Sequence, residues 1–117
     1  MRKGIVRATG GDLSLSKIVL GTCYYGTDIP KDTAYDMLDM YYAAGGRTLD
    51  TARVYGLDAA EHSASERTVG DWMKSRGVRD EMLLVTKGGH PQLYDLHVSR
   101  LSEGEIYADF EASMRDL

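Results

Sequence analysis

The segment Leu49-Asp50-Thr51-Ala52-Arg53-Val54-Tyr55-Gly56 is the most informative part of this chain, together with Thr86-Lys87-Gly88-Gly89 further along. Asp50 ends one short apolar segment and Lys87 ends another, while Tyr55 lies in the loop after the first. Barrel-type α/β proteins place their chemistry where the strands end. The two segments therefore predict a site in which a carboxylate, a phenol and an amine meet, and they favour carbonyl chemistry over simple packing.

Strand and helix patterns alternate three times along the chain. Short apolar runs predict strands at residues 17–22, 47–50 and 82–86. Apolar residues at helical spacing predict helices at residues 30–44, 64–75 and 102–116, the second ending at a Gly77 C-cap. Two short runs on either side of a turn at residues 9–12 predict an N-terminal hairpin. Such repeated βα units predict parallel strands, so a part of a barrel and a small open doubly wound sheet fit equally well at this stage.

Each predicted helix carries apolar residues along one stripe. We expect the first strand to be buried, because Ile18, Val19 and Leu20 are too continuously apolar for a half-exposed strand. The helical stripes are Ala34, Met37, Leu38 and Tyr41 in the first helix, Val69, Trp72 and Met73 facing inward in the second, and Ile106, Phe110 and Met114 at a spacing of four in the third.

Composition argues against several classes of partner. The 117 residues carry a net charge of −4 and contain no long block of Lys and Arg, so nucleic acid and anionic membranes are not expected partners. Cys23 is the only cysteine, which rules out an intrachain disulfide and predicts a reducing compartment such as the cytoplasm. We see no secretory signal, and the longest apolar run, residues 82–85, is far shorter than the roughly 20 residues a membrane span needs.

The motif D-T-A-x-x-Y-G at residues 50–56, followed by a strand that ends in T-K-G-G at residues 86–89, resembles the aldo-keto reductase superfamily. Further matches are L-G-T at residues 20–22 and, on the helix after the tyrosine, S-E at 65–66 and V-G at 69–70. The resemblance implies a (β/α)8 TIM barrel. A complete barrel takes roughly 250 residues, with a floor near 200.

The resemblance therefore implies that residues 1–117 are an incomplete N-terminal portion of a single barrel domain. They would supply the N-terminal hairpin and about the first three βα units. In the family, the catalytic histidine follows the fourth strand, and most contacts to the cofactor diphosphate come from the last units. Those groups are expected beyond residue 117, and an isolated fragment is expected to be inactive and prone to association through its uncovered sheet.

The activity that the resemblance implies is NADPH-dependent reduction of a small-molecule carbonyl, which is an aldehyde, a ketone or a sugar. Reduction needs a proton donor, and a phenol serves near neutral pH only when a nearby cation lowers its pKa from about 10. By resemblance, Tyr55 is the general acid, Lys87 is the cation, and Asp50 orients Lys87 beside the nicotinamide. The full set of implied site residues is catalytic Asp50, Tyr55 and Lys87, cofactor-binding Gly21, Thr22, Cys23 and Asp50, and substrate-binding Tyr24 and Tyr55.

Simpler interpretations of the same residues stay open. Asp50 could cap a loop, Tyr55 could be one of eight tyrosines that pack, and Lys87 beside two glycines could be a solvated charge. The chain could also belong to a non-catalytic binding or regulatory protein on the same scaffold, as in the potassium-channel β-subunits, or form a small α/β domain of its own. No metal site is expected, because His90, Asp95 and His97 lie in an irregular loop that fixes no coordination geometry.

Overall fold

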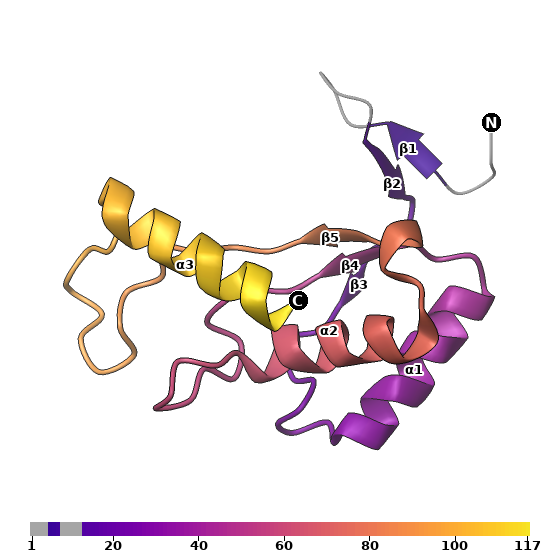
Figure 1. The fold of residues 1–117 in the computed structure, drawn as a ribbon, viewed down its shortest axis with the longest axis horizontal. Helices are drawn as coiled ribbons and strands as arrows, with labels where there is room; N and C mark the ends of the chain where they lie inside the picture. The colour runs from indigo at the N-terminus through magenta and orange to yellow at the C-terminus, as the bar shows by residue number, and fades with distance from the viewer. Residues whose placement is uncertain (1–4, 8–12) are drawn as a thin grey trace.

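The computed structural model describes residues 5–7 and 13–117 (Figure 1). Strands β1 (Ile5–Arg7) and β2 (Ser14–Ser16) form an antiparallel hairpin in which Ile5 pairs with Ser16. The predicted N-terminal hairpin is therefore confirmed, while the turn expected at residues 9–12 lies outside the described residues. The hairpin is tied to the main sheet, because the Ser16 amide donates to Thr48 Oγ1 at 2.8 Å.

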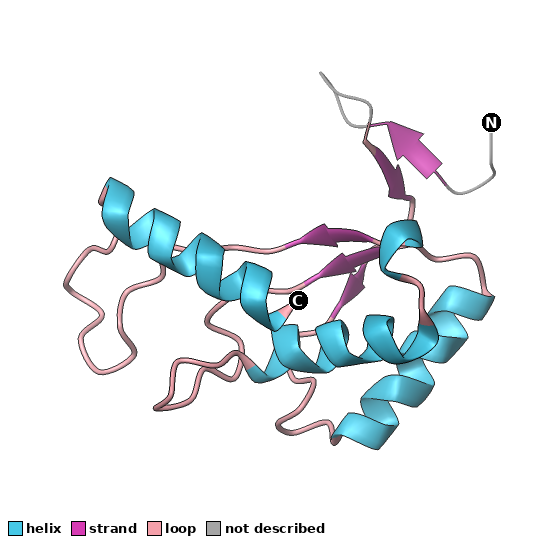
Figure 2. Cartoon of the chain, viewed as in Figure 1, coloured by secondary structure: helices cyan, strands magenta, loops and turns pink. Residues whose placement is uncertain are grey.

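The main sheet has three parallel strands in the order β3-β4-β5. They are β3 (Leu20–Gly21), β4 (Thr48–Asp50) and β5 (Leu83–Val85). Helix α1 (Lys31–Ala43) connects β3 to β4, α2 (Ala64–Arg76) lies between β4 and β5, and α3 (Glu103–Asp116) follows β5. Figure 2 shows α1 and α2 on the same side of the sheet. The predicted βα alternation is confirmed, and a short 3₁₀ turn that was not predicted, η1 (Arg79–Glu81), lies between α2 and β5.

The core lies between α1, α2 and β4. Its largest fully buried side chains include Leu38, Leu49 and Trp72. The predicted inward stripe of α2 is confirmed, because Val69, Trp72 and Met73 are all buried. The indole N–H of Trp72 donates to Asp39 Oδ1 of α1 at 2.8 Å, so the core tryptophan keeps a polar partner.

Both ends of α2 carry the features that stop a helix from fraying. Ser63 is the N-cap and its side chain accepts a hydrogen bond from the Glu66 amide. Gly77 is the C-cap in the left-handed conformation, with φ of 65°, as the sequence predicted.

On α1 the predicted apolar stripe is only partly right, because Ala34 and Leu38 are buried but Met37 is 37% exposed.

The prediction of a buried first strand over residues 17–22 was wrong in extent. Only Leu20 and Gly21 form the strand, and Ile18 is 76% exposed. β3 is the edge of the described sheet, so no described strand pairs along its free side, and residues 17–19 just before it are exposed.

The third helix is placed with its polar side inward. A capping box between Ser102 and Glu105 begins α3. Its buried residues are Asp109, Ser113 and Asp116, while the apolar stripe noted in the sequence, Ile106, Phe110 and Met114, is exposed. The end of α3 packs closely on α2, because a Cβ at Gly70 would overlap the carbonyl oxygen of Asp116. Among the described helices, none is both long and apolar enough to cross a membrane.

Candidate active site

The ends of β4 and β5 bring the two sequence motifs side by side. Asp50 ends β4 opposite Val85, and the chain beyond each strand stays paired for a few residues. The Thr51 amide donates to the Val85 carbonyl at 2.8 Å, and the Arg53 amide donates to the Lys87 carbonyl at 3.0 Å. The parallel register therefore places the Lys87 backbone against the loop that leads to Tyr55.

Lys87, Asp50 and Tyr55 meet at this edge of the sheet. The Lys87 ammonium donates to Asp50 Oδ1 at 2.8 Å and to the Thr51 carbonyl at 2.7 Å. Its Nζ also lies 3.4 Å from the Tyr55 hydroxyl and 4.9 Å from the centre of the Tyr55 ring. Lys87 thus contacts both of the other residues predicted from the sequence, Asp50 at the end of β4 and Tyr55 in the loop that follows it.

The charge on Lys87 is stabilised by these contacts. Burial disfavours the ammonium form, but the hydrogen bonds with Asp50 and Tyr55, together with the attraction of Asp50, outweigh burial and raise the pKa of Lys87. Lys87 is therefore a cation throughout the neutral range. A fixed cation beside a phenol favours the phenolate that is left when the phenol gives up its proton.

The backbone of Tyr55 is held against the start of α2. The Tyr55 carbonyl accepts hydrogen bonds from Ser63 Oγ at 3.0 Å and from the Ser65 amide at 3.2 Å. Gly56 follows in the left-handed region at φ of 68°, and a Cβ there would collide with the Ala64 side chain. The glycine of the D-T-A-x-x-Y-G motif is thus required both for its conformation and for the close approach of the loop to α2.

Three fully buried hydroxyl groups join the ends of β3 and β4 to α2. Thr51 Oγ1 lies 2.7 Å from Ser65 Oγ, which donates to the Thr22 carbonyl at 2.7 Å. Thr22 Oγ1 in turn lies 3.0 Å from the carbonyl oxygen of Asp50, to which it donates. These contacts keep the Asp50 backbone in place, because buried hydroxyls are costly to leave unpaired.

The residues expected to approach a cofactor lie on the same edge of the sheet. Gly21 ends β3 opposite Asp50, and a Cβ on Gly21 would meet nothing within 4 Å. Cys23 is exposed and Tyr24 is 58% exposed in the loop that follows. Neither of them lines the hollow of about 300 Å³ next to Tyr55, whose walls are Ala52, Val54, Tyr55, Lys87, Gly88, Gly89 and His90.

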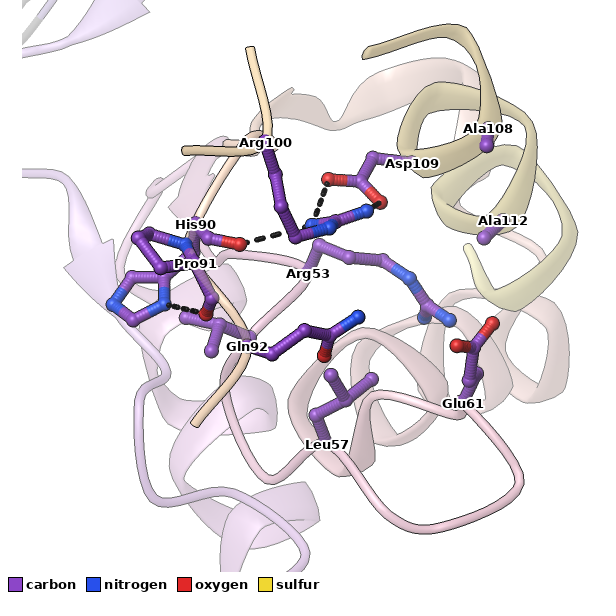
Figure 3. Close-up of a pocket in the computed structure, with 11 residues that line it drawn as sticks. Arg53, Leu57, Glu61, His90, Pro91, Gln92, Arg100, Ala108, Asp109 and Ala112 are labelled. Atoms are coloured by element: carbon purple, nitrogen blue, oxygen red, sulfur yellow. Dashed lines mark hydrogen bonds and ion pairs between the residues drawn. The ribbon is translucent and has the colours of Figure 1, made fainter. Parts of the chain in front are cut away.

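A second hollow lies between α3 and the segment that begins at Arg53 (Figure 3). Arg100 donates to both carboxylate oxygens of Asp109, at 3.0 and 2.8 Å, and to the His90 carbonyl at 2.9 Å. Asp109 also accepts from the Gly89 amide at 2.8 Å. The Arg100–Asp109 pair thereby fixes the loop that follows Lys87 to α3.

A buried charge cluster was not predicted from the sequence. Arg53 Nη1 lies 2.7 Å from Asp116 Oδ2 and 3.5 Å from Glu66 Oε2, and each of these three side chains is at most 7% exposed. From the sequence, Glu66 was part of the motif match and was expected to support the first turn of its helix, where a negative charge is favoured. Asp116 is far from Arg53 along the chain. Their contact exists only because the end of α3 packs on the loop that carries Arg53.

The sequence predicted that His90, Asp95 and His97 do not form a metal site. His90 Nδ1 lies 2.7 Å from the Pro91 carbonyl, and the His97 amide lies 3.4 Å from Asp95 Oδ1. Within residues 5–7 and 13–117, no group of three or more His, Cys, Asp or Glu side chains is arranged around a common point.

The described strands are parallel and alternate with helices, and an ammonium, a carboxylate and a phenol meet where the strands end. These features define an α/β protein whose candidate site lies at the carboxyl ends of its strands. Residues 17–117 match the Aldo/keto reductase family, and the chain belongs to that family. An aldo-keto reductase structure from Bacillus halodurans superimposes with a TM-score of 0.76 at 26% identity, covering 97% of this chain and 36% of that one. The resemblance inferred from the motifs is therefore confirmed.

Two curated relatives are similar over most of this chain. A norsolorinic acid reductase of Emericella nidulans is 39% identical over 82 residues, which are 64% of this chain and 20% of that protein. An aryl-alcohol dehydrogenase [NADP(+)] of Phanerodontia chrysosporium is 36% identical over 88 residues, which are 68% of this chain and 22% of that protein. The chain thus spans about a fifth of the length of these relatives.

Proposed function

We propose that this chain carries the proton-transfer part of an NADPH-dependent carbonyl reductase, with Tyr55 as the general acid. The observation that carries the proposal is the position of the Lys87 ammonium, which is within hydrogen-bond distance of both Asp50 and the Tyr55 hydroxyl. A phenol held by a cation is suited to protonate the alkoxide that forms when hydride reaches a carbonyl carbon. The oxidoreductases among the relatives support this class of reaction.

Each residue has a separate part in the proposed reaction. Tyr55 binds the carbonyl oxygen and donates its proton as negative charge develops there. Lys87 stabilises the phenolate that remains, and Asp50 keeps the ammonium aimed at the phenol. A bound nicotinamide supplies the hydride. In the oxidative direction the same phenolate accepts the proton.

We infer that the cofactor lies along the edge of the sheet formed by Gly21, Thr22, Cys23 and Asp50, with Tyr24 and Tyr55 facing the small-molecule carbonyl substrate. The open surface at Gly21 and the hollow beside Tyr55 and Lys87 leave room for a flat ring at this edge. NADP(+) in the name of one relative supports the phosphorylated cofactor, and a reducing compartment such as the cytoplasm suits the proposed enzyme.

We propose further that the chain is the N-terminal portion of a (β/α)8 barrel. In that arrangement the next βα unit covers the exposed apolar side of α3, and a further strand pairs with the free edge of β3. The coverage of the Bacillus halodurans enzyme, in which this chain matches 36% of the length, supports this assignment. The intact mass of the natural polypeptide tests it: a mass of 12.9 kDa would contradict the proposal, and about three times that mass is expected.

The proposed activity is tested by NADPH oxidation across a panel of aromatic and aliphatic aldehydes, with the protein at its natural length. Tyr55→Phe is expected to lower kcat at least about 100-fold, because it removes only the proton donor. Tyr94→Phe is the control, because Tyr94 is 88% exposed and does not line the hollow beside Tyr55 and Lys87. Equal activity of the two variants would refute the role of Tyr55, and NADPH binding without any turnover would favour a non-catalytic protein.

A further inference from the structure

Glu66 lies at the point where the two active-site segments approach α2. Its side chain is completely buried. Thr86 Oγ1 donates to Glu66 Oε1 at 2.6 Å, and Thr86 is the residue directly before Lys87. Glu66 Oε2 faces Arg53 Nη1 at 3.5 Å, and Arg53 lies between Asp50 and Tyr55 in the chain. One carboxylate therefore contacts both segments that carry the proposed catalytic residues.

Arg53 joins the same two segments a second time, through its backbone. Its amide donates to the Lys87 carbonyl at 3.0 Å. Its guanidinium points the other way, into the buried cluster with Glu66 and Asp116. Arg53 thus couples the position of Lys87 to the position of the loop that bears Tyr55.

The charges in this cluster depend on one another. Glu66 Oε2 is buried and has no hydrogen-bond partner among the described residues, so Arg53 is the cation that compensates it. Asp116 Oδ2 accepts from Arg53 and, at 3.1 Å, from the Ser63 amide. The other basic groups around Asp116 are His62 at 3.3 Å, Arg115 at 3.5 Å and Arg67 at 3.8 Å. Removal of Arg53 leaves Glu66 without its nearby cation, whereas Asp116 keeps other partners.

We propose that Arg53 and Glu66 are positioning residues, which together hold the Lys87 ammonium at hydrogen-bond distance from the Tyr55 hydroxyl. The proposal rests on the function proposed above. The present separation of 3.4 Å is at the long end for a hydrogen bond, so a further shift of the loop breaks the contact. Misplacement of a catalytic group by about 1 Å can cost about 100-fold in rate.

The test compares Arg53→Met with Arg53→Lys in the protein at its natural length. Because Nη1 alone contacts both carboxylates, a lysine ammonium at that point can restore both pairings. Val69→Ala is the control, because Val69 is a buried core residue of α2, the helix that carries Glu66, and is not one of the charged residues of the cluster. Glu66→Gln tests the other member of the Arg53–Glu66 pair, since glutamine keeps the shape of the side chain and the Thr86 contact but removes the charge. This variant replaces Arg53→Met if the Arg53→Met protein does not fold.

Two readouts are measured for each variant. The first is kcat and KM for the carbonyl substrate at saturating NADPH. Arg53→Met is expected to lower kcat about 10- to 100-fold with little change in KM, and Arg53→Lys is expected to recover most of that loss. The second is amide hydrogen exchange in the peptides that contain residues 51–56 and 86–90. In Arg53→Met, amide exchange in these peptides is expected to be faster than in the wild type. In Val69→Ala it is not expected to be faster, when the two variants are compared under conditions that give them the same global stability.

The two readouts separate this proposal from the proposed function. If kcat and local exchange in Arg53→Met match those of Val69→Ala, the pair has no positioning role and the proposal is overturned. If the wild-type protein reduces no carbonyl, the proposed function fails, and hydrogen exchange alone decides whether Arg53 and Glu66 hold the two loops together. A loss of kcat that Arg53→Lys does not recover would contradict the pairing as described.

Discussion

Helices α2 and α3 are both amphipathic, yet they attach to the protein by opposite faces. α2 buries Val69, Trp72 and Met73 against α1 and the sheet. α3 instead buries Asp109 and Asp116, and its apolar residues are exposed. Apolar packing, which does not depend on pH, holds α2, whereas ion pairs, which do depend on pH, hold α3. An apolar stripe therefore predicts a helix without showing which of its faces is covered.

The difference matters for the site because both helices hold active-site loops. α2 holds the backbone of Tyr55 through Ser63 and Ser65 at its first turn. α3 holds the loop after Lys87 through the carboxylate of Asp109, which binds the Gly89 amide. The Tyr55 backbone is thus held by hydrogen bonds to the first turn of α2, while the residues following Lys87 depend on the Arg100–Asp109 ion pair.

The largest expected effect on stability comes from the core of α2. Trp72→Ala should lower the free energy of unfolding by about 3–5 kcal/mol, because it removes the largest fully buried side chain and leaves a cavity. Urea denaturation followed by circular dichroism measures the change. A loss below about 1 kcal/mol would mean that α2 is not held chiefly by packing.

A smaller and pH-dependent effect is expected at the end of α3. Burial opposes ionisation of Asp116, but the Ser63 amide and the Arg53 guanidinium outweigh burial and lower the pKa of Asp116. A carboxyl with a lowered pKa in the folded state stabilises the fold above its unfolded pKa, near 3.9, and this stabilisation is lost as the pH falls through the folded pKa.

Asp116→Asn should therefore cost about 1–3 kcal/mol at pH 7, and the difference from the wild type should shrink below about pH 4. Urea denaturation at a series of pH values from 3 to 7 measures this dependence. Trp72→Ala is the matched comparison, since its cost should change little over the same range. A constant cost of Asp116→Asn at all pH values would contradict the role assigned to its charge.

The smallest effect is expected on the outer side of α3. Phe110→Ser in the 117-residue chain should change the free energy of unfolding by no more than about 0.5 kcal/mol, because Phe110 is 59% exposed. In the protein at its natural length, the same substitution should cost more, because the proposed barrel covers this side. Equal costs in both polypeptides would contradict the barrel assignment.

The sequence predicted the order of the elements and the three central site residues because both depend on local patterns. Apolar segments followed by Asp50 and Lys87 imply a shared edge once the strands are parallel, and in the structure Asp50 ends β4 while Lys87 lies just beyond the end of β5. The position of Arg53 against Asp116 was not predictable, since it arises where a helix end packs on a distant loop. The exposure of Ile18 was not predictable either, because it depends on what pairs with β3 and not on the apolar run itself.

The central claim is that Lys87 and Tyr55 act as one unit, and a double-mutant cycle on kcat tests it most directly. Lys87→Met, Tyr55→Phe and the double variant are measured with one aldehyde in the protein at its natural length. If Lys87 acts through Tyr55, the double variant should be about as slow as Tyr55→Phe alone, because a cation without its phenol has nothing left to assist. Losses that multiply in the double variant would show that the two residues act independently and would contradict the account.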